Sequence, residues 1–397
     1  MNENQPPSSD VELTIRMPSN KKFVKRFYCW ILRSTVVFWD VKRYGRILII
    51  LDGDDDDAKG SNNKLIQALD NLKHPFLEFR YIYEAPPMDK KAFEVKTRSQ
   101  ALRNYGYLLQ LYSMFLMDLY TNSSVIAYTD TDAPFILPVG HSAIFSEEGK
   151  LKVIGIRTTI QGIDIQWTRA TNNLLGLPMV FDFMSYFPVY LYPSTIKNCR
   201  DFITQRLKVK TFEEAFLKGS RYFVSTVNVI LTYAFFYERH RYDWHLDIGE
   251  GETMATFNTK YFLILQNSPL LRQDIQAEPH DTLHVSYYDR FRHHPLESAI
   301  CFLQIKLKRD ITQDCTRYLG KVHWDPYEFE NVKKQVKSWC SGRDGMEKCE
   351  RLVEQRYLDY TNRITMEGAV DFDVGHIKQV EQNLRSYYNY TCSALYI

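Results

Sequence analysis

The chain has 397 residues, with 50 Lys and Arg against 48 Asp and Glu, which gives a net charge of +2. Hydrophobic residues make up 45% and charged residues 25% of the sequence. This is the composition of a globular protein with a substantial core, in one large α/β domain or two medium ones. No long basic stripe is interleaved with aromatic residues, so the sequence lacks the electrostatic footprint of a nucleic-acid-binding protein.

The N-terminal segment is polar and lacks the apolar core of a signal peptide, and we expect residues 1–10 to be disordered. The apolar run from Phe27 to Trp39 is interrupted by Arg33 and is too short to cross a bilayer. Seven cysteines form no CxxC pair, which argues against a zinc ribbon. Four of them lie between residues 301 and 349, which permits lumenal disulfides without requiring them.

Strand patterns begin early in the chain. Residues Val11 to Met17 alternate apolar and polar side chains, which predicts a half-buried strand, and Phe23 to Trp39 reads as a helix packed against the sheet. The continuous apolar run Arg46 to Leu51, bounded by Asp-Gly, predicts a strand buried on both faces. Glu78 to Tyr83 is a further predicted strand.

From Ser99 to Tyr120 apolar residues recur at helical spacing, which predicts a helix. Short strands are predicted after it, over Val125 to Tyr128 and Leu151 to Ile156. Two more helices are expected in the middle of the chain, Thr195 to Leu207 and Val224 to Glu238. Alternation of strands and helices predicts an α/β fold with a central, mostly parallel sheet flanked by helices and joined by right-handed crossovers.

Two carboxylates, Asp130 and Asp132, come directly after the strand that ends at Tyr128. In open α/β sheets ligands bind beyond the carboxyl ends of the strands. Carboxylates one residue apart can face the same ion, and Mg²⁺ and Mn²⁺ prefer carboxylate oxygen while leaving positions for substrate phosphates. Such a metal would neutralise charge on a nucleoside-diphosphate leaving group. The alternative is an Asp-rich turn whose side chains cap the backbone.

The segments Asn104 to Gln110 and Val125 to Ile136, with the helix through Leu119 between them, resemble the GT-A-fold glycosyltransferases. In that superfamily a helix with a Gly-aromatic…Gln pattern precedes a strand ending in the DxD metal motif. The likeness covers roughly residues 11 to 160. It implies a GT-A-like nucleotide-diphospho-sugar transferase fold, a nucleotide-sugar donor with Mn²⁺ or Mg²⁺, and transfer of a hexose to a glycan or glycoconjugate acceptor.

By this resemblance Asp130 would lie near the ribose and the metal, and Asp132 would be the main metal ligand. Many members of the superfamily close the metal shell with a late histidine, and His284 in an apolar segment matches that feature, with His280 as second choice. A single histidine in an apolar run is also common as a hydrogen-bonded structural residue, so both interpretations of His284 stay open.

The donor side of the site draws on the same helix, where Tyr107 and Gln110 belong to the matching pattern. Related enzymes often carry a lysine in the middle of this helix, and this chain has Ser113 at that place. Arg98 and Arg103 are the local cationic candidates for the diphosphate, by charge alone.

Asp52 ends the second strand on the donor side, which makes it a candidate nucleotide ligand. It opens the acidic run to Asp57. That run fails the EF-hand pattern, and a solvated loop is the alternative to a second cation site.

An inverting transferase needs a carboxylate base near the acceptor hydroxyl, and Asp164 and Asp182 are the candidates. The resemblance also places the loop with Trp167 against the acceptor as a sugar-stacking platform. Ser225 and Asn228 open a helix rich in Tyr and Phe, where they would bind acceptor hydroxyls or cap the helix.

We expect a catalytic domain over residues 11–325, with a donor-binding half at about 11–160, an acceptor-binding half at about 161–325, and a C-terminal helical extension at 326–397. The resemblance favours a Golgi or secretory-pathway lumen, with the cytoplasm as the alternative, and this chain shows no membrane-spanning segment. No GxSxG, Walker A or Rossmann glycine motif is present. The alternatives are a sugar nucleotidyltransferase and a catalytically silent carbohydrate- or nucleotide-binding protein of the same fold.

Overall fold

The structure is a computed structural model, and it describes residues 10–18, 23–24, 27–32, 35, 39–53, 56–71, 76–99, 105–131, 133, 135, 139–157, 165–184, 187–220 and 224–247. The chain divides into two units. The main unit holds the described residues of Met1–Val24, Lys42–Asp130 and His141–Asp281, and the second unit holds those of Lys25–Val41, Thr131–Gly140 and Thr282–Ile397. Both sheets belong to the main unit.

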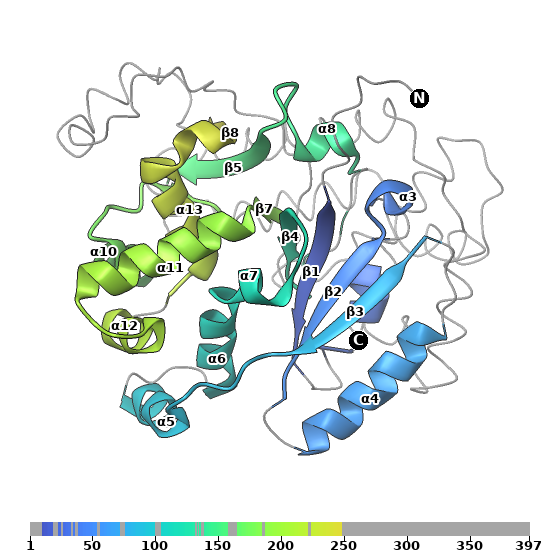
Figure 1. Cartoon of the computed structure of the whole chain (residues 1–397), viewed down its shortest axis with the longest axis horizontal. Helices are drawn as coiled ribbons and strands as arrows, with labels where there is room; N and C mark the ends of the chain where they lie inside the picture. The colour runs from blue at the N-terminus through green and yellow to red at the C-terminus, as the bar shows by residue number, and fades with distance from the viewer. Residues whose placement is uncertain are drawn as a thin grey trace, which may run out of the picture. The chain divides into compact units, whose positions relative to one another are not determined.

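A five-stranded sheet forms the centre of the main unit (Figure 1). Its strand order is β3-β2-β1-β4-β7, in which the first four strands are parallel and β7 is antiparallel to β4. The predicted α/β fold with a central, mostly parallel sheet flanked by helices is therefore confirmed. The strands are β1 (Val11–Met17), β2 (Arg46–Leu51), β3 (Glu78–Tyr83), β4 (Val125–Thr129) and β7 (Val189–Leu191).

Strand β1 is buried along its whole length, so the prediction of a half-buried strand is wrong. The polar members of its alternating pattern are buried as well, because later segments of the chain supply their partners. Glu12 accepts hydrogen bonds from Arg80 on β3, at 2.7 Å, and from Thr121. A buried carboxylate is tolerated when it is paired in this way.

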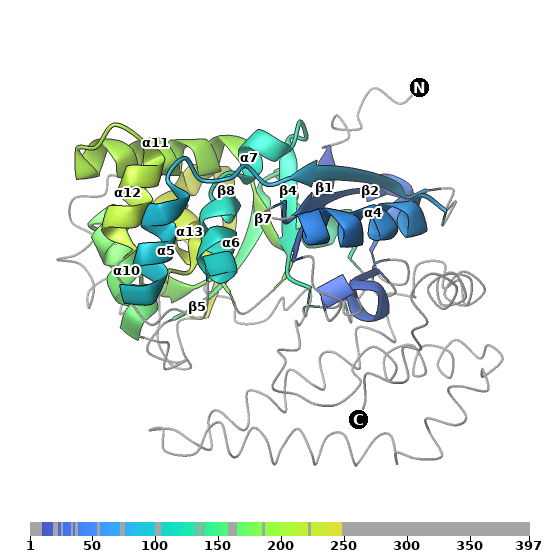
Figure 2. The ribbon, with the colours of Figure 1, turned by 90° about the horizontal axis from the view of Figure 1, so that it is seen from below.

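Helix α4 (Asp56–Asp70) follows β2 and lies beside β3, where the Tyr81 hydroxyl donates to Asp70 at 2.9 Å (Figures 1 and 2). The prediction of a solvated loop through Asp57 is therefore wrong for its last two residues, because the helix begins at Asp56.

The single helix expected from Ser99 to Tyr120 is also wrong. The described segments are α5 (Lys90–Ser99), α6 (Tyr105–Met114) and α7 (Met117–Tyr120). Phe115 and Leu116 form a tighter turn between the last two helices. Arg200 stabilises this break, because its guanidinium donates both to the Phe115 carbonyl and to the Asp118 carboxylate.

The second sheet has the order β6-β5-β8, with β5 parallel to β8 and antiparallel to β6. One of its faces packs against helix α13, as shown by ring centroids of Phe181 and Phe235 at 5.5 Å and of Phe235 and Trp244 at 5.3 Å. Its strands are β5 (Leu151–Arg157), β6 (Phe181–Asp182) and β8 (Tyr242–Asp247).

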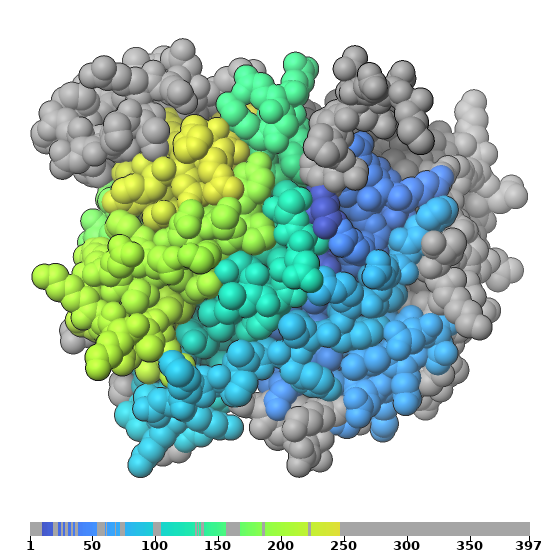
Figure 3. Space-filling view, viewed as in Figure 1, coloured from blue at the N-terminus to red at the C-terminus, as the bar shows by residue number. Residues whose placement is uncertain are grey.

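The helices around this second sheet gather on one side of the main unit, coloured green to yellow in Figures 1 and 3. The two predicted helices of this region are confirmed as α11 (Pro193–Leu207) and α13 (Thr226–Tyr237). Two further helices, α10 (Ile165–Leu175) and α12 (Phe212–Gly219), were not predicted. The short elements are α3 (Val41–Tyr44), α8 (His141–Ile144) and the 3₁₀-helix η2 (Arg239–Arg241).

In the second unit, residues Phe27–Leu32 form the π-helix η1 inside the segment expected to be a helix from Phe23 to Trp39. The C-terminal extension over 326–397 and the predicted disordered N-terminus up to residue 9 lie outside the described residues. Within the described part of the chain, none of the helices has the length and apolar character needed to cross a membrane.

Glycine is required at position 155 by the packing of the second sheet. A Cβ atom on Gly155 would lie 2.8 Å from Cε1 of Phe183 and 3.0 Å from Cδ2 of Leu246. We predict that Gly155→Ala lowers the free energy of unfolding by about 1–3 kcal/mol through overpacking, as measured by urea denaturation.

The matched control is Gly60→Ala in α4, where an added Cβ meets no atom within 4 Å. Because alanine favours helix, this variant should be more stable than the wild type by about 0.5–1 kcal/mol. Equal stability of the two variants would contradict the packing described for Gly155.

Candidate functional site at the carboxyl edge of the parallel sheet

The carboxyl ends of β1 to β4 meet at one edge of the five-stranded sheet. The chain passes from β1 to β2 and β3 on one side, and then returns to place β4 on the other side of β1. The direction of strand order thus switches between β1 and β4. In open α/β sheets the crevice outside such a switch point is where ligands bind.

Two predicted site residues flank this switch point. Asp52 follows β2 and Asp130 follows β4, and both are half-buried. Their strands are separated by β1, and the register offsets the two residues by two positions along it. With an interstrand spacing of about 4.8 Å and a rise of about 3.3 Å per residue, the two Cα atoms are about 12 Å apart. Carboxylate oxygens bind Mg²⁺ at about 2.1 Å, so this separation suits one metal ligand and one nucleotide ligand better than two ligands of the same ion.

The backbone at Asp52 is held from three directions. Its N–H donates to the Met17 carbonyl at 3.3 Å, and Asn62 of α4 donates from Nδ2 to its carbonyl at 2.7 Å. The next residue, Gly53, packs against Tyr83, whose Cδ1 would lie 3.1 Å from an added Cβ. The Asp52 backbone is therefore fixed at the sheet edge, and Tyr83 stands beside it with 40% of its surface exposed.

Beneath this edge lies a buried ion pair that sequence reasoning missed. Arg16 on β1 donates from Nη2 and Nε to the two carboxylate oxygens of Glu84, at 2.7 and 3.2 Å, and each side chain is 2% exposed. Burial opposes the charge on Arg16, but the attraction and hydrogen bonds of Glu84, with smaller contributions from Asp52 and Tyr128, raise the pKa of Arg16 above its usual value. Arg16 therefore keeps its charge, and its two hydrogen bonds to Glu84 tie the end of β1 to the end of β3.

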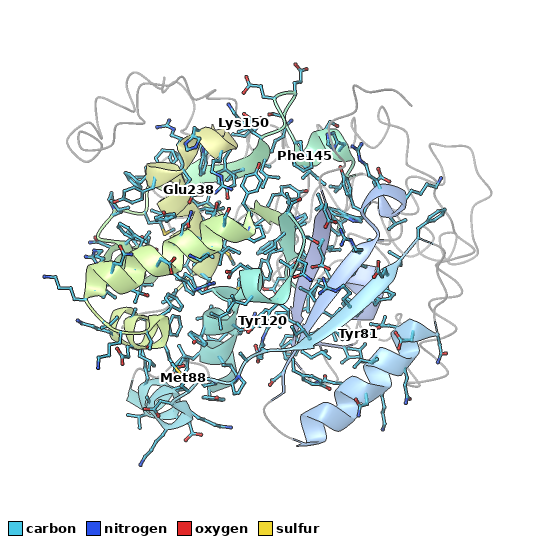
Figure 4. The ribbon with its side chains drawn as sticks, viewed as in Figure 1. Tyr81, Met88, Tyr120, Phe145, Lys150 and Glu238 are labelled. Carbon is cyan, nitrogen blue, oxygen red and sulfur yellow. The ribbon has the colours of Figure 1, made fainter. Side chains whose placement is uncertain are left out.

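Tyr120 of α7 covers the same end of the sheet (Figure 4). Its hydroxyl accepts a hydrogen bond from the Ala85 N–H at 3.1 Å and lies 3.4 Å from Oγ of Ser113. Burial raises the pKa of Tyr120, so the phenol is neutral at physiological pH. Ser113, at the place where the sequence resemblance implies a lysine, is itself buried in this contact and has no charge to offer a diphosphate.

The remaining predicted donor-side residues are placed only in part. Tyr107 and Gln110 are half-buried on α6, and Arg98 lies on α5. Their contact with the edge that carries Asp52 and Asp130 stays a prediction. Four predicted site residues lie outside the described residues, namely Arg103, Asp132, Asp164 and His284, as does the second-choice His280.

The described residues contain no group of three or more His, Cys, Asp and Glu side chains arranged to hold a metal ion. Of the predicted metal ligands, Asp130 is the member that falls among them. Its carboxylate at a strand end is the kind of oxygen donor that Mn²⁺ and Mg²⁺ prefer. The described residues thus fit one part of the expected metal site.

Asp182, a predicted catalytic base, is buried at the end of β6. Its Oδ1 accepts hydrogen bonds from Nδ2 of Asn228 at 2.8 Å and from the Met184 N–H at 3.0 Å, and Oδ1 of Asn228 accepts from the Phe183 N–H at 2.7 Å. Asp182 and Asn228 thus join β6 to the start of α13. The role of Asp182 as a base stays a prediction.

Ser225 is the N-cap of α13 and accepts a hydrogen bond from the Asn228 N–H, which confirms the helix-cap interpretation of this pair. Trp167 lies on helix α10 and is half-buried, so the loop that was expected to carry it is wrong at this residue. The position of Trp167 is therefore set by the helix that begins at Ile165, and not by a loop.

A further polar pair was missed by sequence reasoning on β8. Oδ2 of Asp243 lies 2.9 Å from Nε2 of His245, and the hydrogen bond from His245 lowers the pKa of Asp243. The spacing Asp-x-His in a strand was the available signal, because residues two apart share a face of a sheet.

The sequence matches no protein-family model and no curated protein sequence. The structure is similar to an active-site mutant of LgtC, with 10% identity and a TM-score of 0.31 over 53% of this chain and 70% of that chain. It is also similar to the apo form of the bifunctional glycosyltransferase WbbM, with 12% identity and a TM-score of 0.31 over 67% of this chain and 51% of WbbM. Both of these structures are glycosyltransferases.

We predict that Glu84→Ala lowers the free energy of unfolding by about 3–5 kcal/mol, because it leaves Arg16 buried without its counter-charge. The double variant Arg16→Met with Glu84→Leu should recover most of that loss, since it removes both charges and keeps apolar volume. Urea denaturation of Arg16→Met, of Glu84→Leu and of the double variant measures the coupling between the residues.

The control is the exposed pair of Lys197 and Asp201 on α11, with Nζ and Oδ2 at 2.7 Å. Asp201→Ala should change the free energy of unfolding by no more than about 0.5 kcal/mol, because solvent screens an exposed pair. A similar small effect for Glu84→Ala would show that the Arg16 pair does not stabilise the sheet.

Proposed function

We propose that the protein is a metal-dependent glycosyltransferase that moves a hexose from a nucleotide-diphospho-sugar to a glycan or glycoconjugate acceptor. The observation that carries this proposal is the position of Asp52 and Asp130, which flank the end of β1 at the switch point of a parallel sheet. That position is where α/β proteins bind nucleotides, and the two carboxylates are spaced for different parts of one such ligand.

In this proposal Asp130 and Asp132 hold Mn²⁺ or Mg²⁺, with His284 as a third ligand. The bound metal supplies Lewis-acid stabilisation of the charge on the diphosphate leaving group. Asp52, fixed by Met17 and Asn62, accepts hydrogen bonds from the nucleoside.

Around this centre, Tyr107 and Gln110 line the donor side, and Arg98 and Arg103 supply positive charge for the diphosphate. On the acceptor side, Asp164 or Asp182 would serve as the base if the reaction inverts the anomeric centre. The buried Arg16 and Glu84 pair supports the edge from below, and it does not contact the ligand in this proposal.

We predict that UDP or GDP with Mn²⁺ raises the melting temperature, and that one of the two gives the larger shift. Asp130→Asn and Asp132→Ala should each abolish the part of the melting-temperature shift that depends on Mn²⁺, because the cation loses a charged ligand. Thermal denaturation with and without EDTA measures the effect. Asp201→Asn, an exposed carboxylate on α11, is the matched control and should keep the full shift.

The same proteins are then tested for turnover by release of nucleoside diphosphate from a panel of nucleotide-sugars. The wild type should hydrolyse one of them slowly without an acceptor, while Asp132→Ala should not. A protein that binds nucleotide and Mn²⁺ but never releases diphosphate is a binding protein of the same fold. If Mn²⁺ still stabilises Asp130→Asn and Asp132→Ala as much as the wild type, the metal site lies elsewhere.

We predict a different result for Asp52→Ala. It should raise the KM for the nucleotide-sugar about ten- to a hundredfold through loss of hydrogen bonds to a charged group, and leave the Mn²⁺ concentration for half-maximal activity unchanged. Steady-state kinetics with each component varied separates the two constants. A shift in the Mn²⁺ requirement alone would instead assign Asp52 to the metal.

A further inference from the structure

Among the residues that the structure describes, Nδ1 of His245 is buried without a hydrogen-bond partner, and the proposed donor site does not use it. Strand β8 turns Trp244 toward the aromatic core, where its ring centroid lies 5.3 Å from that of Phe235 and 5.9 Å from that of Phe183. Side chains alternate along a strand, so Asp243 and His245 point to the opposite face of the second sheet.

The hydrogen bond to Asp243 orients the imidazole and selects its tautomer. An ionised carboxylate only accepts hydrogen bonds, so at 2.9 Å from Oδ2 the Nε2 atom of His245 carries the hydrogen. In a neutral ring Nδ1 then bears the lone pair and is an acceptor. His245 is 6% exposed, and within the described residues its Nδ1 is buried without a hydrogen-bond partner. Leaving such an atom unpaired costs free energy, which a bound donor would offset.

The charges around this pair favour a neutral donor over a cation. Lys152 lies opposite Asp243 in the register of β5 and β8, and Lys150 precedes β5 (Figure 4). After the hydrogen bond from His245, the positive charges of Lys152 and Lys150 also act to lower the pKa of Asp243. Two lysines near the site repel a metal ion, and the described residues contain no group of three metal-ligating side chains.

His245 and the predicted base Asp182 both lie in the predicted acceptor-binding half, at about residues 161–325. In the sheet register His245 pairs with Ile154 on one side of β5, and Asp182 pairs with Ile156 on the other side. The Asp182 carboxylate turns to Asn228 of α13, which covers the aromatic face, so the polar face of His245 is formed by β5 and β8. The Asp243 side chain is 28% exposed, so the pair runs from solvent to the buried imidazole.

We propose that Nδ1 of His245 accepts a hydrogen bond from a hydroxyl group of the acceptor saccharide, with Asp243 as the positioning residue that holds the ring. This inference rests on the proposed glycosyltransferase function, and it names a residue of the acceptor site. The ligand is a neutral polyol, because a hydroxyl supplies the donor that Nδ1 lacks without adding charge beside Lys152.

The test compares His245→Phe, which keeps a ring without an acceptor, with His245→Asn, which keeps an acceptor oxygen. The probes are the methyl glycosides of glucose, galactose and N-acetylglucosamine, with the nucleotide-sugar that the wild type hydrolyses. His245→Phe should raise the KM for the active methyl glycoside about tenfold, and His245→Asn should raise it less. Hydrolysis of the donor without acceptor should be unchanged in both. His240→Phe, at an exposed position on η2, is the matched control and should leave all constants unchanged.

A second readout does not depend on turnover. In ¹⁵N-histidine-labelled wild type, the active methyl glycoside should shift the Nδ1 resonance of His245. Asp243→Asn should alter the tautomer balance of the ring in the absence of sugar and weaken the shift on adding it, which a merely structural role for Asp243 would not do.

An unchanged KM for the acceptor in folded His245→Phe would overturn the inference. Loss of Mn²⁺-dependent stabilisation in this variant would also overturn it, because His245 would then be a ligand of the cation. Failure of the proposed function is a separate result, because the wild type would then release no diphosphate from any nucleotide-sugar. In that case the resonance of His245 still decides, and no shift with any of the three methyl glycosides overturns hydroxyl binding.

Discussion

Pairing of the buried charges on β1 is the constraint on which the rest of the main unit depends. This strand lies inside the sheet and is buried throughout, yet it carries Glu12 and Arg16 on one face. Neither charge can be solvated there, so each requires a fixed partner. Arg80 and Glu84, before and after the end of β3, supply them. A slip of one residue would turn the charges to the opposite face, so the pairs specify the strand register as well as stabilise it.

The register in turn determines what stands at the carboxyl edge. With β1 held between β2 and β4, Asp52 and Asp130 follow their strands on either side of it. The attraction of Arg16 extends to Asp52, so the support beneath the edge and the edge itself form one electrostatic unit. The rigid part of the proposed donor site is thus the sheet, and the other proposed metal ligands, Asp132 and His284, come later in the chain.

The two faces of the second sheet carry different kinds of side chain. One face is aromatic and packs on α13, and at Gly155 it leaves no room for a side chain. The opposite face is polar, with the His245 and Asp243 pair beside Lys152. A sheet that is anchored on one face can hold an imidazole in a fixed orientation on the other, which is the requirement for recognising a hydroxyl group.

Local patterns in the sequence were sufficient for the strands of the parallel sheet, for helices α11 and α13, and for the position of Asp130 after β4, because side-chain period and burial on both faces are properties of neighbouring residues. They could not show that β1 is fully buried, since the charged partners of Glu12 and Arg16 each lie 68 residues away in the sequence. The same limit explains the break before α7, which depends on Arg200 of a later helix, and the missed pair on β8. Only tertiary packing brings charges from distant segments into a low-dielectric interior, where each must find its partner, and that step decided which polar residues support the fold.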